Sequence, residues 1–331
     1  MMFTIPLLLA VPLLAIGFTA RSRSLEKSYI ATLTTATAHL AATVYLLLTQ
    51  RNPFAANTWF GIDPLGSFFL LILSHTFLAV ALYSPGFLQR MQKPEYNASR
   101  RLYYPALNSY LLANTLVIIT QHFSLLWVVL ELTTFSLAPL IYFYRSKESL
   151  EAVWKYLFLV SLGLVFLLIG ILAFGLAAKG AGEHASLLLA DLVRDAAQLD
   201  PLWVKVGFVF ALVGISAKIG LAPMHPADID ATSNAPGPVA ALMAGSLRST
   251  AIAGIAPVLR SRLQYKRARV FAALVDDRGC LLALGGSRLH LAEPRLQAVA
   301  RLFERGASWH HHAVNRRGRC RDARGAAAHA V

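Results

Sequence analysis

The chain is poor in charge and in cysteine. Only 15% of its 331 residues are charged, whereas a soluble domain of this length carries about a quarter. Its two cysteines, Cys280 and Cys320, lie far apart in the sequence, and such a pair forms neither a convincing zinc site nor a disulfide framework. These scarcities argue against a cytosolic globular enzyme and against a small disulfide-rich protein.

The motifs of nucleotide and redox cofactors are also missing. There is no Walker A loop and no G-x-G-x-x-G that opens a helix after a strand, so neither ATP-driven transport nor a dinucleotide fold is predicted. No cysteine cluster could hold iron–sulfur, and no pair of intramembrane histidines has the spacing of haem ligands. We therefore expect no cofactor, no metal and no catalytic chemistry in this chain alone.

Apolar residues, by contrast, make up 56% of the chain, and the mean hydropathy is +0.54. They fall in blocks of about twenty, the length that spans a bilayer. The blocks predict an all-α polytopic membrane protein with about eight spans: 3–19, 30–49, 66–83, 103–121, 123–144, 153–177, 201–222 and 237–259. The first block has no basic residue before it, so we expect a retained helix rather than a cleaved signal.

Basic residues in the short loops predict the orientation. Loops 20–29, 84–102 and 145–152 hold most of the lysine and arginine between the spans, so these loops are expected in the cytoplasm and the N-terminus outside. Within 183–199, leucines recur at helical spacing opposite acidic and basic residues. That pattern predicts a short helix lying on the outer membrane surface.

The last segment has a different composition. Residues 260–331 hold 15 of the 31 basic and 5 of the 17 acidic residues, and they include no apolar block long enough to span a bilayer. We expect the product of a shifted reading frame in a GC-rich gene, or a disordered tail. The alternative is a basic cytoplasmic domain that touches anionic lipid or nucleic acid. The segment lacks an aromatic–basic pattern, so nucleic acid is not expected as a partner.

Ionisable residues inside the predicted spans are candidates for function, because a bilayer penalises buried charge. Glu131 is the ninth residue of the span 123–144, about 12 Å along a helix that rises 1.5 Å per residue. This places it near mid-membrane with apolar neighbours on every side. We predict a functional carboxylate; the alternative is a structural group that holds helices together.

Two lysines follow in the next two spans. Lys155 begins the span 153–177, where it could equally be an interfacial lysine paired with Glu151 one helical turn earlier. Lys218 precedes a segment in which Gly220, Pro223 and Pro226 cannot continue a helix, so the seventh span is predicted to break there. Broken helices at membrane depth line cavities and recur at ion sites of transporters, which favours a functional role for Lys218.

The remaining candidates are secondary. Arg248 is always protonated and suits a fixed counter-charge better than a proton carrier, although an accident of packing or lipid contact is the alternative. His225 and Asp230 flank the break and could relay protons. His39 and His75 lie on apolar spans and are expected to be hydrogen-bonded core residues.

Four segments carry a resemblance to a known family: Trp127–Thr134, Leu150–Tyr156, Ala217–His225 and Ala235–Gly245. In this order they resemble the proton-conducting antiporter-like membrane subunits of NADH:quinone oxidoreductase (complex I) and of group 4 membrane-bound hydrogenases. Two of the strings, Leu150–Tyr156 and Gly220–His225, resemble hydrogenase-4 component F. The resemblance covers roughly residues 100–259 and implies a bacterial inner-membrane protein that is part of a fourteen-helix antiporter-like fold.

The resemblance also implies roles for single residues. Glu131, Lys155 and Lys218 match a mid-membrane chain of charges, in which Lys155 pairs with Glu131 in one state. His225 and Asp230 match the family's loop pattern His-x-Trp-Leu-Pro-Asp-Ala-His-Ser-Glu-Ala-Pro. Here Ala227, Thr232 and Asn234 replace the tryptophan, the second histidine and the glutamate, so part of that polar cluster is lost. The second half-channel of the family is not expected within the eight spans.

We therefore expect three parts: N-terminal helices in 1–100, a partial first half-channel in 101–259, and the basic tail 260–331. The predicted function is redox-driven proton translocation, with other membrane subunits and a peripheral redox arm as partners. Two alternatives stay open: a structural membrane anchor for a hydrogenase or dehydrogenase, and a subunit of a multi-protein cation/proton antiporter.

Overall fold

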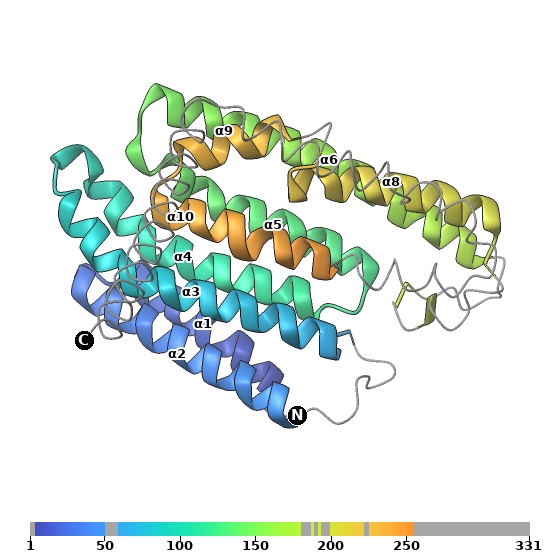
Figure 1. The fold of residues 1–331 in the computed structure, drawn as a ribbon, viewed down its shortest axis with the longest axis horizontal. Coiled ribbons are helices and arrows are strands. Elements are labelled where there is room, and N and C mark those ends of the chain that lie inside the picture. Colours follow the sequence, from blue (N-terminus) through green and yellow to red (C-terminus); the bar gives the residue numbers. More distant parts are fainter. Residues whose placement is uncertain are drawn as a thin grey trace, which may run out of the picture. The chain divides into compact units, whose positions relative to one another are not determined.

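The structure, a computed structural model, describes residues 4–49, 59–179, 187–188, 191–192, 199–221 and 225–254. Within these ranges the regular elements are helices, and the only β-type pairings are two isolated bridges, Phe60 with Thr120 and His122 with Leu188. The predicted all-α class is therefore confirmed (Figure 1).

Seven helical segments in the described part of the chain are long and apolar enough to cross a membrane. The long helices are α1 (Thr4–Arg21), α2 (Leu25–Thr49), α3 (Pro64–Arg90), α4 (Asn97–Ile119), α5 (Phe123–Ile141), α6 (Lys147–Lys179) and α8 (Pro201–Ile219). Single 3₁₀ turns, η1 (Pro94–Tyr96) and η2 (Tyr142–Tyr144), flank α4 and α5.

The predicted seventh span breaks as expected, and the eighth is irregular. Beyond the break lie the short helix α9 (Pro226–Asn234) and then α10 (Gly237–Leu242), which passes into the π-helix η3 (Met243–Leu247). Residues 248–254 return to α-helix. The eighth span is thus a helix with a π segment near its start, a feature that often marks functional sites.

The π segment is held by a side chain from α4. Tyr110 donates a hydrogen bond from its hydroxyl to the Leu242 carbonyl at 3.2 Å and also lies 2.7 Å from Ser246 Oγ. Further along, a Cβ atom added to Gly254 would lie 3.2 Å from Val117 and 3.1 Å from Leu126. The eighth span therefore runs alongside α4 and reaches α5.

Glycines bring α6 and α8 together. A Cβ atom on Gly170 would lie 2.7 Å from the Gly207 carbonyl oxygen, and one on Gly214 would lie 2.5 Å from the Leu167 nitrogen. Such backbone-to-backbone contact is open only to residues without a side chain. The two helices consequently run side by side over most of their length (Figure 1), and this contact brings the C-terminal end of α8 close to α5.

The N-terminal helices are joined by a buried neutral network. His39 on α2 contacts Ser74 Oγ on α3 at 2.8 Å through Nδ1 and Thr115 Oγ1 on α4 at 3.0 Å through Nε2. Thr43 Oγ1 lies 3.0 Å from the same Ser74 hydroxyl. His39 is therefore a hydrogen-bonded core residue, as predicted, whereas the same prediction for His75 is wrong, because His75 is exposed on α3.

Two predictions fall on parts of the chain that the structure does not describe. The predicted surface helix within 183–199 lies almost wholly outside the described residues, and so does the basic segment 260–331 with both cysteines. Both remain predictions.

Candidate functional site

Lys218 is the most deeply buried charged side chain of the predicted set. It lies in the last turn of α8 and is 2% exposed. Its Nζ donates hydrogen bonds to Thr134 Oγ1 at 2.6 Å and to the Leu130 carbonyl at 3.2 Å, both on α5. Both acceptors are neutral, so these hydrogen bonds satisfy two donors of the amine without neutralising its charge.

The helix break beside Lys218 is fixed by Gly220. This residue ends α8 in the left-handed region with a φ of 77°, which a glycine adopts without steric cost. A Cβ atom here would also lie 2.7 Å from Asp228 Oδ2 on α9. The left-handed backbone and the close carboxylate together disfavour any residue with a side chain at position 220. Pro226 then begins α9, with its φ already fixed by the proline ring.

Glu131 sits one residue after the carbonyl that Lys218 binds. Its Oε2 accepts a hydrogen bond from Ser161 Oγ of α6 at 3.2 Å, and the residue before it, Leu130, accepts one from Lys218 through its carbonyl. The side chain is partly exposed rather than surrounded by apolar groups on every side. Glu131 therefore lies between α5 and α6, close enough to bias the charge of Lys218.

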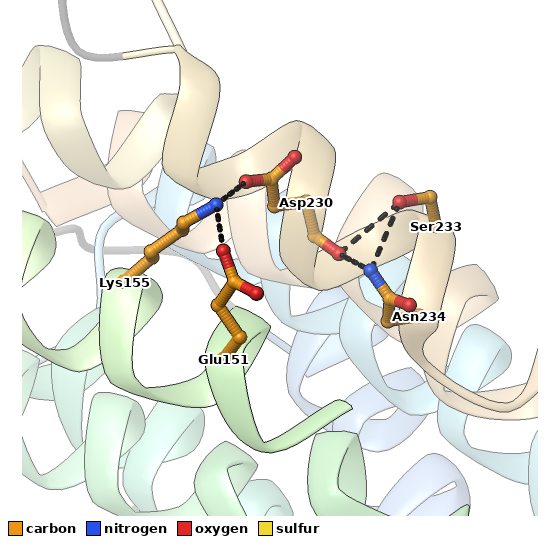
Figure 2. A network of polar contacts seen from close by, with 5 residues as sticks. All are labelled: Glu151, Lys155, Asp230, Ser233 and Asn234. Carbon is orange, nitrogen blue, oxygen red and sulfur yellow. Dashed lines mark hydrogen bonds and ion pairs between the residues drawn. The ribbon is translucent and has the colours of Figure 1, made fainter. Parts of the chain in front are cut away.

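Lys155 contacts α9 instead of the segment of α5 that Lys218 contacts (Figure 2). Its ammonium group sits between two carboxylates, 2.7 Å from Glu151 Oε1 and 3.2 Å from Asp230 Oδ2. Its side chain is 47% exposed. Because α6 begins at Lys147 rather than at 153, Lys155 is in the third turn instead of the first.

The contacts of Lys155 differ from those that the resemblance implies. The helical pair with Glu151 is formed, and Lys155 also joins α6 to α9 through Asp230. The ion pairs of Lys155 in this structure are with these two carboxylates and not with Glu131. Asn234, which replaces the family glutamate, donates its side-chain amide to the Asp230 backbone carbonyl at 2.9 Å and so stiffens α9 (Figure 2).

A second ion pair was not predicted. Arg248, just after the π-helix, donates from Nη2 to Asp228 Oδ2. The Asp228 side chain is 4% exposed and that of Arg248 is 38% exposed. Sequence reasoning selected Arg248 and passed over Asp228. The signal was present, because the family loop pattern has a leucine where this chain has Asp228.

The described residues thus form three linked positions. Lys218 of α8 contacts the segment of α5 that carries Glu131. Lys155 and Asp230 join α6 to α9. Arg248 and Asp228 join the helix after the π segment to α9, beside the break. His225 precedes Pro226 at the start of α9. No three histidine, cysteine or acidic side chains of the described ranges come together in a way that could hold a metal ion.

These features define a class: a multi-pass helical membrane protein with an amine buried at a helix break and carboxylates on the neighbouring helices. The family follows from comparison. Residues 120–283 match the family described as NADH:quinone oxidoreductase/Mrp antiporter, transmembrane part. The predicted resemblance to the antiporter-like membrane subunits is therefore confirmed over these residues.

Curated relatives agree with this assignment. The chain is 31% identical over 213 residues to a hydrogenase-4 component F homologue of Methylacidiphilum infernorum, covering 63% of this chain and 44% of that protein. It is 30% identical over 246 residues to NADH-quinone oxidoreductase subunit 14 of Thermus thermophilus, covering 74% and 50%. The chain therefore spans about half the length of the curated relatives it matches.

Solved structures support the fold. A chain of respiratory complex I from Thermus thermophilus superposes with a TM-score of 0.61 at 26% identity, covering 77% of this chain and 52% of that one. A chain of an archaeal membrane-bound sulfane sulfur reductase superposes with a TM-score of 0.67 at 22% identity, covering 82% and 55%. The second likeness concerns the fold alone.

Proposed function

We propose that this chain conducts protons as a membrane subunit of a redox-driven complex, with Glu131, Lys155 and Lys218 as the groups that carry them. The observation behind the proposal is the position of Lys218: an amine buried at a helix break, hydrogen-bonded to neutral oxygens and near a carboxylate. Burying a charged amine at membrane depth costs free energy. A purely structural role does not account for this cost.

Electrostatics provides the coupling between the two groups. An ionised Glu131 stabilises the ammonium form of Lys218, because opposite charges favour each other's charged forms. Protonation or movement of Glu131 removes that stabilisation, and Lys218 then releases its proton more readily. A change in one group thus drives proton transfer at the other, without bond-making chemistry in this chain.

Lys155 and Asp230 supply the side of proton uptake in this proposal. Both are partly exposed, so they exchange protons with water, and their ion pair connects α6 to α9. When Asp230 or Glu151 is protonated, Lys155 loses a partner and becomes free to turn toward Glu131. His225 is a further relay, and Arg248 is the fixed counter-charge.

The setting is also a proposal. The N-terminus would lie outside a bacterial inner membrane, with other membrane subunits and a peripheral redox arm as partners. The names of the relatives in respiratory complex I and hydrogenase-4 support this setting.

The test uses the complex assembled in its host membranes. Inverted vesicles are energised with NADH, formate or hydrogen in turn, and the protons taken up per electron transferred are measured with a pH-sensitive dye. We expect Lys218→Met and Glu131→Gln each to lower this ratio by about tenfold or more while the complex still assembles. Unchanged ratios in both variants would overturn the proposal and favour a structural anchor.

A matched control uses the same chemistry outside the cluster. Lys27→Met removes an exposed lysine near the start of α2 and is expected to leave the ratio unchanged. A third outcome concerns the family's antiporter branch. Proton movement that requires sodium but no electron donor would replace redox-driven conduction by cation/proton antiport.

A further inference from the structure

Tyr156 is a buried polar group that the proposed mechanism does not use. It follows Lys155 on α6 and is 2% exposed. Its hydroxyl oxygen is buried and has no hydrogen-bond partner within the described residues. A buried phenol hydroxyl normally finds a partner, because without one the group bears the full cost of its removal from water. The missing partner therefore points to a bound molecule.

Residues near Tyr156 on α6 contact the two helices that carry Asp228 and Glu131. One residue before it, Lys155 reaches Asp230 on α9, two residues from Asp228. Five residues after it, Ser161 donates to Glu131 on α5. The Tyr156 phenol interacts electrostatically with Asp228, with Glu131 and with Tyr110 of α4. The phenol is therefore buried within electrostatic reach of two carboxylates and of a second phenol.

Other unpartnered atoms gather near the same ion pair. Thr232 Oγ1, one turn after Asp228 on α9, and Arg248 Nε are both buried without a hydrogen bond in the described part of the chain. Polar atoms that are buried and unsatisfied in a polar surrounding are the sites where proteins hold internal water. The cluster around Asp228 therefore has the chemistry of a hydrated pocket.

We propose that Tyr156 binds buried water and relays protons between Asp228 and Glu131. The inference rests on the proposed proton conduction and assigns the link between two of its charged groups. In one step the Tyr156 hydroxyl donates its proton to the water on the Glu131 side and accepts a proton from the water on the Asp228 side. The phenol ends as it began, and one proton has moved.

The first experiment removes only the hydroxyl. Tyr156→Phe in the assembled complex is expected to lower the protons moved per electron by about tenfold or more. The control is Tyr103→Phe on α4, a tyrosine 1% exposed whose hydroxyl lies 3.0 Å from Ser84 Oγ, in the N-terminal helices. It is expected to leave the ratio unchanged. An unchanged ratio for Tyr156→Phe as well would overturn the relay.

A second experiment separates a relay from a structural role. Difluorotyrosine introduced at position 156 retains the hydroxyl and nearly the same shape but is a stronger acid. The groups that face it are Glu131 from α5, Asp228 from α9 and Tyr110 from α4. A relay moves the alkaline limb of the pH profile of proton translocation to lower pH, and an unmoved profile overturns the proposal even if Tyr156→Phe fails to assemble.

The two levels of proposal fail differently. If Lys218→Met and Glu131→Gln leave proton movement intact, the proposed function fails. If those variants abolish it while Tyr156→Phe and the fluorinated residue behave as the parent does, the relay alone fails.

Discussion

The N-terminal helices and the helices around the break bury polar groups in contrasting ways. His39, Ser74, Thr43 and Thr115 satisfy one another through neutral hydrogen bonds. Around the break, by contrast, the amine of Lys218 binds only neutral oxygens, and the hydroxyl of Tyr156 has no partner in the described ranges. Burial of polar groups alone therefore does not mark a functional site.

The two regions differ in the charge of their buried polar groups and in how completely those groups are hydrogen-bonded. A closed neutral network fixes helix packing and has no need for a further partner. A buried charge beside incomplete hydrogen bonding remains responsive to the protonation of its neighbours. Four predictions test whether the two regions respond differently when their packing, charges or protonation change. The substitution expected to cost the most stability comes first.

The largest effect is expected where α6 and α8 touch. Gly170→Ala would place a Cβ atom 2.7 Å from the Gly207 carbonyl oxygen, so the helices must separate, at a cost of about 3 kcal/mol. The same substitution at Gly86 of α3 meets nothing within 4 Å and should stabilise the helix by about 0.5–1 kcal/mol. Thermal unfolding of the purified chain, followed by circular dichroism, compares the two. Equal effects would contradict close backbone packing.

The next effect concerns the ion pair beside the break. Asp228→Asn leaves Arg248 without its carboxylate, and because Arg248 is 38% exposed, the loss should be only about 1–3 kcal/mol. Adding Arg248→Met should recover part of this stability, because no unpaired charge remains. The double-mutant cycle is measured by the same unfolding assay. Strictly additive effects would show that the pair is not coupled.

His39→Leu probes the neutral network. It removes two hydrogen bonds of a buried side chain, and we expect a loss of about 1–2 kcal/mol, since Ser74 and Thr115 keep their bonds to their own helices. Proton translocation in the assembled complex should not change. A fall comparable to that of Lys218→Met would erase the distinction between the two regions.

The smallest effect is a pH dependence between α4 and α5. His122 stacks on Trp59 with ring centroids 4.7 Å apart, and burial lowers the pKa of His122 below its usual 6.5. Between the two pKa values the unfolded chain binds more protons, so stability is lost as the pH falls below about 6.5. Unfolding temperatures above and below that pH should differ more for the parent than for His122→Gln. An identical pH dependence of the unfolding temperature in the parent and in His122→Gln would contradict this prediction.

Much of the fold could be read from the sequence because it depends on local properties. Apolar blocks of bilayer length located α1 to α6 and α8 with each end correct to within about seven residues, and the glycine and prolines after Lys218 predicted the break correctly. The predicted start of α6 lies six residues too late, because the first two turns of this helix are mostly polar and do not belong to the apolar block. The π-helix was not predicted, and residues 243–247 contact a residue on another helix, Tyr110 of α4.

The site was less predictable. Each candidate residue stands out because ionisable residues are rare in apolar spans. The motif resemblance then relates these residues to a chain of charges along the family's sequence. The partner of each charge was not available from either source. Lys155 lies with Glu151 and Asp230, and Arg248 lies with Asp228, a residue that sequence reasoning had not considered.

The sequence by itself determined where the chain crosses a membrane, where it breaks and which ionisable residues are buried at a cost. Length, hydropathy and backbone restrictions suffice for these, because each acts within a few residues. Tertiary structure alone decided the pairing of those charges. Pairing depends on interatomic distances of a few ångströms between helices, and these are set by how closely Gly170 and Gly214 allow α6 and α8 to approach and by how α9 lies over Gly220.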